Sequence, residues 1–150
     1  MTRGEQAEQY FRTGYNCTQA VVLAFMDDLN ADRETLMAAA HPFGGGMGRL
    51  RLTCGAVTGA VMCLGLFFPA LKKSELYALV QEFSRRFEEK NGSIVCGTLL
   101  TGAGLKTDRS PQAEARTEEY YKKRPCPLLI HDAADILEEM LKENGMLSEH

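Results

Sequence analysis

Apolar residues recur at helical spacing along most of the chain, and no stretch shows the sustained polar and apolar alternation that is typical of a strand. The first predicted helix covers about residues 3–11. The second begins with Asn16 as its cap, and its apolar stripe extends to Leu29. A third helix, capped by Asp32, ends at His41, because the residue before a proline is pushed out of helical geometry.

The fourth predicted helix is uncharged. It begins at Thr53 as its cap, and residues 54–71 contain no charged side chain, which approaches the length of a membrane-spanning helix. Pro69 cannot continue a helix, so about 14 helical residues remain, or roughly 21 Å against the ~30 Å of a hydrocarbon core. We therefore expect a buried central helix and no membrane insertion.

Three further helices and one short helical turn follow. An amphipathic helix begins after Ser74, and the short turn covers residues 96–100. Residues 110–123 are expected to form a mostly polar helix, because a serine cap and a first-turn proline open it. The last helix begins at the proline break around Cys126. The sequence therefore predicts an all-α fold, a compact bundle of about six to seven helices.

The composition limits the binding partners and the cellular compartment that we expect for the chain. The chain has 150 residues, of which 45% are hydrophobic, so we expect a single domain over residues 1–150. A net charge of −3 supplies no excess of cations for nucleic acid or for an anionic lipid surface. The odd number of cysteines, five, and the absence of an apolar signal segment at the N-terminus favour a cytoplasmic protein with reduced thiols.

The cysteines form no CxxC pair, which excludes a thioredoxin-type motif and a zinc ribbon. Four of them lie at or near predicted helix starts: Cys17, Cys54, Cys96 and Cys126. Unpaired backbone N–H groups and about half a unit of positive dipole charge at such places favour a thiolate, so a thiol pKa can fall from ~8.5 to neutral or below. Such thiols are nucleophiles, redox couples or metal ligands.

Cys63 differs from the other four. It lies nine residues after Cys54 on the same predicted helix, and nine steps of about 100° place the two side chains on opposite faces. Its apolar neighbours, which include Val61 and Leu64, are typical of a core position. We therefore expect Cys63 to pack in the core and to take no part in a site with Cys54.

Glycines and arginines surround Cys54 in the sequence. Gly55 and Gly59 are one helical turn apart, so another backbone or a bound inorganic group can approach the helix there. The run that contains Gly45 and Gly46 either forms a nest of N–H donors for an anion or turns a corner. These four glycines are candidate cofactor-binding residues. Arg49 and Arg51 could lower a thiolate pKa or bind an anion, but a solvated loop role is the default expectation.

A family resemblance rests on the order of these motifs. Asn16-Cys17 is followed by Phe43-Gly44-Gly45-Gly46-Met47-Gly48, then by Cys54-Gly55-Ala56-Val57-Thr58-Gly59, Cys96 and Cys126. This order resembles the family of redox-active proteins named C_GCAxxG_C_C, although the chain reads CGA where the name reads GCA. The resemblance covers most of the chain. It implies that the four cysteines of the family are Cys17, Cys54, Cys96 and Cys126, that Cys63 has no counterpart, and that the protein has a redox role such as electron transfer.

Three hypotheses follow for the four cysteines. They converge to bind an iron–sulfur cluster or a metal ion for electron transfer with an unidentified redox partner. Alternatively, two of them cycle between dithiol and disulfide, with Cys54 paired to Cys17 or Cys126. The third hypothesis is a structural zinc site that holds helices together in an interaction module. A homodimer would be indicated if residues 67–70 were exposed.

Overall fold

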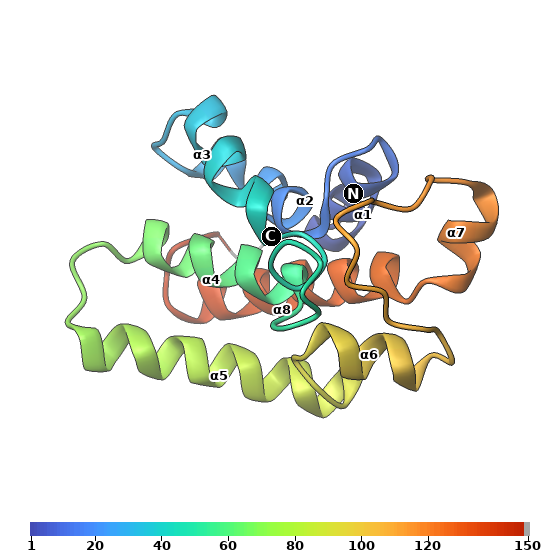
Figure 1. Cartoon of the computed structure of the whole chain (residues 1–150). Helices are drawn as coiled ribbons and strands as arrows, with labels where there is room; N and C mark the ends of the chain where they lie inside the picture. The colour runs from blue at the N-terminus through green and yellow to red at the C-terminus, as the bar shows by residue number, and fades with distance from the viewer. Residues whose placement is uncertain (149–150) are drawn as a thin grey trace.

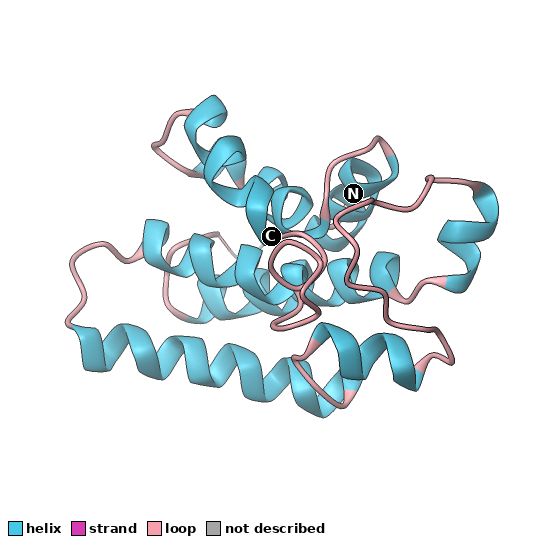
Figure 2. Ribbon diagram, in the orientation of Figure 1, coloured by secondary structure: helices cyan, strands magenta, loops and turns pink. Residues whose placement is uncertain are grey.

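Eight α-helices and two short 3-10 turns make up the regular structure of residues 1–148, the part of the chain that this computed structural model describes (Figures 1 and 2). The helices are α1 (Arg3–Arg12), α2 (Cys17–Ala24), α3 (Arg33–Ala40), α4 (Gly55–Phe67), α5 (Lys73–Asn91), α6 (Cys96–Gly102), α7 (Glu118–Lys123) and α8 (Cys126–Glu143). The 3-10 turns are η1 (Met26–Asp28) and η2 (His41–Phe43). Within the described residues, strand-like pairing is limited to one bridge between Thr53 and Val95. The all-α prediction is confirmed.

The helices pack in layers around α4 and α8. In Figure 1, α5 runs along one side of this pair, and α1, α2 and α3 lie on the other side. α1 packs against both α2 and α8, α2 packs against α4, and α5 contacts both α4 and α8. The side chains that fill the space between the layers include Phe11, Phe25, Phe83 and Phe87, none of which is more than 1% exposed. Burial of these large apolar groups is the main stabilising contribution to the bundle.

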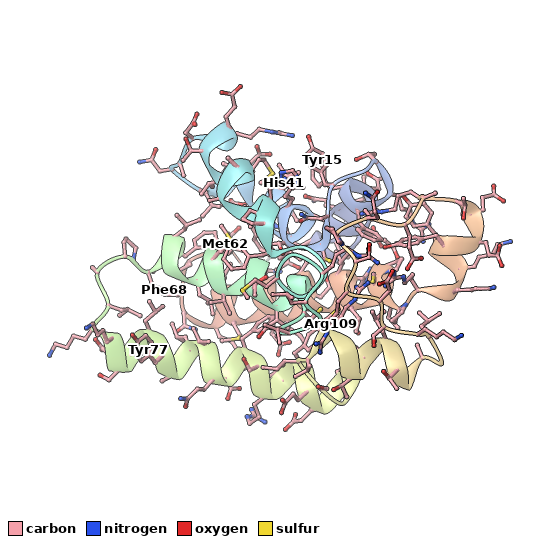
Figure 3. All side chains as sticks on the ribbon, viewed as in Figure 1. Tyr15, His41, Met62, Phe68, Tyr77 and Arg109 are labelled. Atoms are coloured by element: carbon pink, nitrogen blue, oxygen red, sulfur yellow. The ribbon has the colours of Figure 1, made fainter. Side chains whose placement is uncertain are left out.

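α4 is buried at the centre, as predicted. Its buried residues are Gly55, Ala56, Val57, Gly59, Ala60, Cys63 and Leu64. Phe68, which follows the helix and is labelled in Figure 3, is also buried. Phe67 is half-buried and packs edge-on against Phe25, with 6.3 Å between the ring centroids. Pro69 and Ala70 are exposed, and a homodimer stays a prediction. None of the helices in residues 1–148 combines the length and the hydropathy that crossing a membrane requires.

Two helix ends differ from the prediction because distant residues compete for the backbone. α2 ends at Ala24 rather than at Leu29, and η1 follows it. Arg3 donates a hydrogen bond to the carbonyl of Ala24 at 2.7 Å and pairs with Asp28 at 2.5 Å, which stabilises the early helix end. The N-cap of α4 is Cys54 rather than Thr53, because Thr53 forms the bridge with Val95.

The prediction of a helix over residues 110–123 is wrong for its first half. Residues 105–117, which we call the strap, have no regular structure, and α7 begins at Glu118 with Thr117 as its cap. The Arg49 guanidinium donates to the carbonyls of Ser110 and Gln112, so these carbonyls are engaged by a side chain far away in the sequence. Tertiary hydrogen bonds therefore override the local helix signal in the strap.

Candidate functional site

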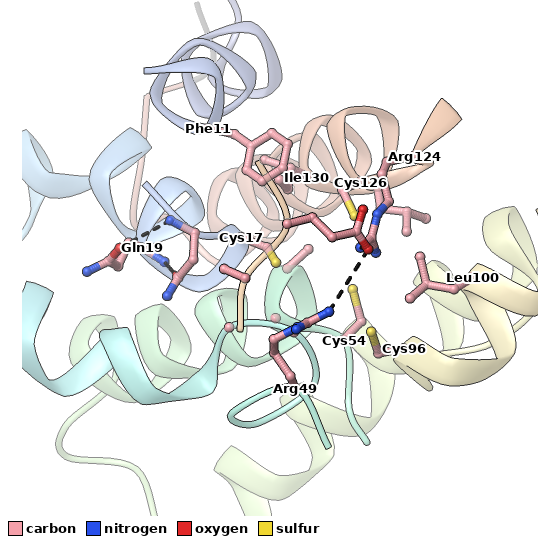
Figure 4. A pocket seen from close by; sticks show the side chains of 18 of the residues that line it. Phe11, Cys17, Gln19, Arg49, Cys54, Cys96, Leu100, Arg124, Cys126 and Ile130 are labelled. Atoms are coloured by element: carbon pink, nitrogen blue, oxygen red, sulfur yellow. Dashed lines mark hydrogen bonds and ion pairs between the residues drawn. The ribbon is translucent and has the colours of Figure 1, made fainter. Parts of the chain in front are cut away.

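The four predicted cysteines face one cavity of about 550 Å³. Cys17, Cys96 and Cys126 are the first residues of α2, α6 and α8, and Cys54 is the N-cap of α4. Figure 4 shows their sulfur atoms pointing into the same space, and all four are free thiols. Four helix starts thus place these side chains along one cavity, and their role as a common site stays a prediction.

Cys63 lies away from this cavity. It is fully buried in the core, and burial raises the pKa of its thiol to about 12. The helix-face argument therefore separated it correctly from Cys54.

Local capping explains the position of Cys17. Asn16 accepts a hydrogen bond from the backbone N–H of Gln19 at 3.0 Å, and the Gln19 side chain accepts one from the N–H of Asn16 at 3.1 Å. The Asn16 amide also donates to the carbonyl of His41 at 2.8 Å, which ties the start of α2 to η2. This reciprocal cap fixes the helix start at Cys17, as the sequence predicted.

Gly55 and Gly59 allow α2 to pack directly against α4. A Cβ atom on Gly59 would lie 2.7 Å from the backbone oxygen of Thr18, and one on Gly55 would lie 3.0 Å from the sulfur of Cys17. The group that lies close to these two glycines is therefore the start of α2, through its backbone and its first side chains. A cofactor-binding role for the two glycines stays a prediction.

The glycine-rich loop turns back on itself. The N–H groups of Gly48, Arg49 and Arg51 donate to carbonyls of residues 42–45, at 2.8, 3.2 and 3.2 Å respectively, so the loop turns a corner. A nest of N–H donors in the run that contains Gly45 and Gly46 stays a prediction. Gly45 lines the cavity, whereas a Cβ on Gly46 would lie 2.7 Å from the Cβ of Cys96. Gly46 therefore makes room for Cys96, and a cofactor contact of either glycine stays a prediction.

Three residues of this loop other than glycine have left-handed backbone conformations: Met47, Arg49 and Arg51, with φ of 69°, 65° and 63°. Such conformations cost roughly 1–2 kcal/mol each for residues with a Cβ. Two of the three, Arg49 and Arg51, direct their side chains to the cavity wall. Strain concentrated in one loop is thus associated with the placement of two guanidinium groups.

The expectation that Arg49 and Arg51 are solvated is wrong. Arg51 is 6% exposed; its Nε donates to the carbonyl of Asp108 at 3.1 Å, and its Nη1 lies 3.9 Å from the sulfur of Cys96. The Arg49 side chain is 12% exposed. Both guanidinium groups are buried because the strap covers them and offers its carbonyls as acceptors.

Three further residues, which no motif in the sequence singles out, line the cavity: Glu114, Arg116 and Arg124. Arg116 donates to the carbonyl of Phe11 at 3.0 Å, and its guanidinium lies 4.1 Å from the centre of the Phe11 ring. Arg124 lies 5.0 Å from the centre of the Tyr120 ring. The expected polar helix over residues 110–123 gives Glu114 and Arg116 no place in a site, and the position of Arg124 two residues before Cys126 is the one available signal.

The predicted lowering of thiol pKa values is wrong for three cysteines. Burial raises the pKa of Cys54, Cys96 and Cys126, and the neighbouring thiols add to the effect by electrostatic repulsion between thiolates. The helix start does lower the pKa of Cys54, through a hydrogen bond from the backbone N–H of Ala56. The rise in pKa that desolvation causes is larger. Arg51 and Arg124 likewise oppose burial at Cys96 and Cys126 respectively.

The donor set suits a soft metal centre by its chemistry. Four thiolates are the ligands of iron–sulfur clusters and of many structural zinc ions. Within residues 1–148, however, no three His, Cys, Asp or Glu side chains gather closely enough to form a ready-made metal site. Metal ligation would therefore require the four thiols to move closer together across the cavity.

Comparison with protein-family models matches residues 15–140 to the family described as "Putative redox-active protein (C_GCAxxG_C_C)". Searches of curated proteins and of solved structures gave no match. The match spans most of the chain and includes all four cysteines of the cavity. The chain therefore belongs to the C_GCAxxG_C_C family of redox-active proteins.

Proposed function

We propose that Cys17, Cys54, Cys96 and Cys126 together hold an iron–sulfur cluster and that the protein transfers electrons. The observation that carries this proposal is that four free thiols, from four separate helix starts, face a cavity of about 550 Å³. Four cysteine ligands are sufficient for a cluster, which supplies one-electron redox chemistry when it is bound.

The cations around the thiols support the proposal. Four thiolates concentrate negative charge in a buried place, and such charge is costly unless opposite charges or hydrogen bonds compensate it. Arg51 contacts Cys96, and the positive charge of Arg124 acts on both Cys96 and Cys126. These two guanidinium groups would stabilise thiolate ligands and retain an anionic cluster.

Anaerobic purification tests the proposal. We expect a visible absorption band together with stoichiometric iron and acid-labile sulfide. Separate Cys→Ser substitutions at positions 17, 54, 96 and 126 should each reduce the iron content, whereas Cys63→Ser should leave it unchanged. Reconstituted protein without iron, or four variants that retain full iron content, would contradict the proposal. Stoichiometric zinc without iron would indicate the structural zinc site instead.

A dithiol/disulfide site is the second candidate, and the contact between α2 and α4 favours it. The sulfur of Cys17 lies against Gly55, the residue after Cys54, so these two cysteines are close neighbours. With oxidised glutathione as the oxidant, formation of one disulfide would consume two protein thiols and release two glutathione thiols. Metal-free protein that loses two thiols, with Cys17 and Cys54 linked in a peptide map, would support this candidate over the cluster.

A further inference from the structure

The charged groups around the cavity are unbalanced. Among the described lining residues, four carry a guanidinium and one carries a carboxylate: Arg49, Arg51, Arg116, Arg124 and Glu114. The chain as a whole has a net charge of −3, so this local excess of positive charge is opposite in sign to that of the molecule. Buried cations are costly unless anions or hydrogen bonds compensate them. The cavity is therefore suited to an anion.

Two of these arginines converge on one atom. Oε1 of Glu114 lies 2.5 Å from Nη2 of Arg124 and 4.0 Å from Nη2 of Arg49. Within residues 1–148, Nη2 of Arg49 is a buried nitrogen with no hydrogen-bond partner. Figure 4 shows Arg49 and Arg124 at the same cavity as the four labelled cysteines. The arrangement leaves a donor of Arg49 unused beside the carboxylate that Arg124 binds.

The three side chains differ in how firmly they are held. Those of Arg124 and Arg49 are 9% and 12% exposed, whereas that of Glu114 is 51% exposed. Arg124 also packs on the ring of Tyr120, and Arg49 is bonded to strap carbonyls. The cations are thus fixed in place, and the carboxylate is the component that can leave.

We propose that Arg49 and Arg124 form a binding site for a small oxyanion, which Glu114 occupies as an internal substitute when no ligand is bound. Guanidinium groups bind carboxylates and inorganic oxyanions through paired N–H donors, which matches the unused donor of Arg49. A ligand here would lie beside Cys96 and Cys126, on which the charge of Arg124 acts. The site goes beyond the proposed redox function and does not require a metal centre.

Calorimetric titration of the intact protein with sodium malonate and with sodium sulfate tests the site. Glu114→Gln removes the internal competitor without removing either cation, so we expect malonate or sulfate to bind this variant about ten-fold more tightly than the unaltered protein. Glu119→Gln is the matched control, because Glu119 pairs with Lys123 and does not line the cavity. It should bind both anions as the unaltered protein does.

Arg49→Gln and Arg124→Gln, each combined with Glu114→Gln, should reverse the gain. Tighter binding of malonate would identify a carboxylate ligand, and tighter binding of sulfate an inorganic oxyanion. If Glu114→Gln binds both anions no more tightly than Glu119→Gln does, the proposal is wrong, whether or not the arginine variants fold. Iron and thiol content measured on the same samples separates this result from failure of the redox proposal.

Discussion

The guanidinium of Arg51 lies 3.9 Å from the sulfur of Cys96. Arg51 reaches this position from a left-handed backbone conformation in the glycine-rich loop, and Cys96 comes from the start of α6. Burial raises the pKa of Cys96, and the positive charge of Arg51 opposes that rise. Arg51 is therefore placed to control how readily this thiol ionises.

Arg51→Gln should make Cys96 less reactive. Without the guanidinium, the pKa of Cys96 rises further, so less thiolate is present at a given pH. We expect alkylation of Cys96 by iodoacetamide to be about three- to ten-fold slower at pH 8 in metal-free protein. Mass spectrometry of the Cys96 peptide measures the rate. Arg109→Gln, an exposed strap residue, is the control, and an equal effect of both changes would contradict the role of Arg51.

Gly59→Ala should destabilise the protein. The added Cβ would lie 2.7 Å from the carbonyl oxygen of Thr18, so α2 must move away from α4. Overpacking of this kind costs about 1–3 kcal/mol, which urea unfolding measures. Gly65→Ala in the same helix meets no atom within 4 Å and should instead stabilise α4 by up to ~1 kcal/mol. Similar effects of the two substitutions would rule out the packing explanation.

Asn16→Ala should cost about 1–2 kcal/mol of unfolding free energy. It removes the side-chain cap of α2 and the hydrogen bond to the carbonyl of His41. Thr2→Ala removes the comparable cap of α1, which is exposed, and serves as the reference. The thermal unfolding midpoint should fall more for Asn16→Ala. If the unfolding midpoints of Asn16→Ala and Thr2→Ala fell equally, the hydrogen bond from Asn16 to the carbonyl of His41 would add nothing to stability.

The ion pairs between α5 and α8 should weaken in acid. Arg86 binds both carboxylate oxygens of Glu143, at 2.8 and 2.9 Å, and also pairs with Glu82. Hydrogen bonds from Arg85 and Arg86 lower the pKa of Glu82 to about 2, and Arg86 lowers that of Glu143.

Because these folded-state pKa values lie below the unfolded value of about 4.5, the pairs stabilise the fold above that pH and lose this contribution as the pH falls toward 2. Urea midpoints measured from pH 7 to pH 3 should therefore decline less in Arg86→Gln than in the unaltered protein. Parallel declines would show that other groups dominate the acid response.

Local signals in the sequence predicted much of the fold. The cap at Asn16 and the stop before Pro42 depend on neighbouring residues, and the structure confirms both. The strap was predicted as a helix because Ser110 and Pro111 form a valid local start. Its conformation depends instead on Arg49, which lies about sixty residues away in the chain. A local sequence pattern gives no sign of a hydrogen bond between residues so far apart in the chain.

The sequence predicted the cysteine site only in part, because local patterns do not show contacts between distant residues. Helix starts and the family motif identified the four cysteines and set Cys63 apart. The direction of the thiol pKa shifts was wrong, because periodicity within a helix does not show how far Cys54 is desolvated by other helices. Arg116 and Arg124 were missed because their partners, Phe11 and Tyr120, bring them to the cavity through tertiary stacking.

The left-handed residues of the glycine-rich loop also make one wall of the cavity depend on tertiary contacts. Isolated from its surroundings, a segment with Met47, Arg49 and Arg51 in this conformation is unfavourable, so the surrounding structure must hold the loop in its shape. The strap carbonyls that accept hydrogen bonds from Arg49 and Arg51 are part of that support. Loss of the strap would therefore loosen this wall as well as uncover the cavity.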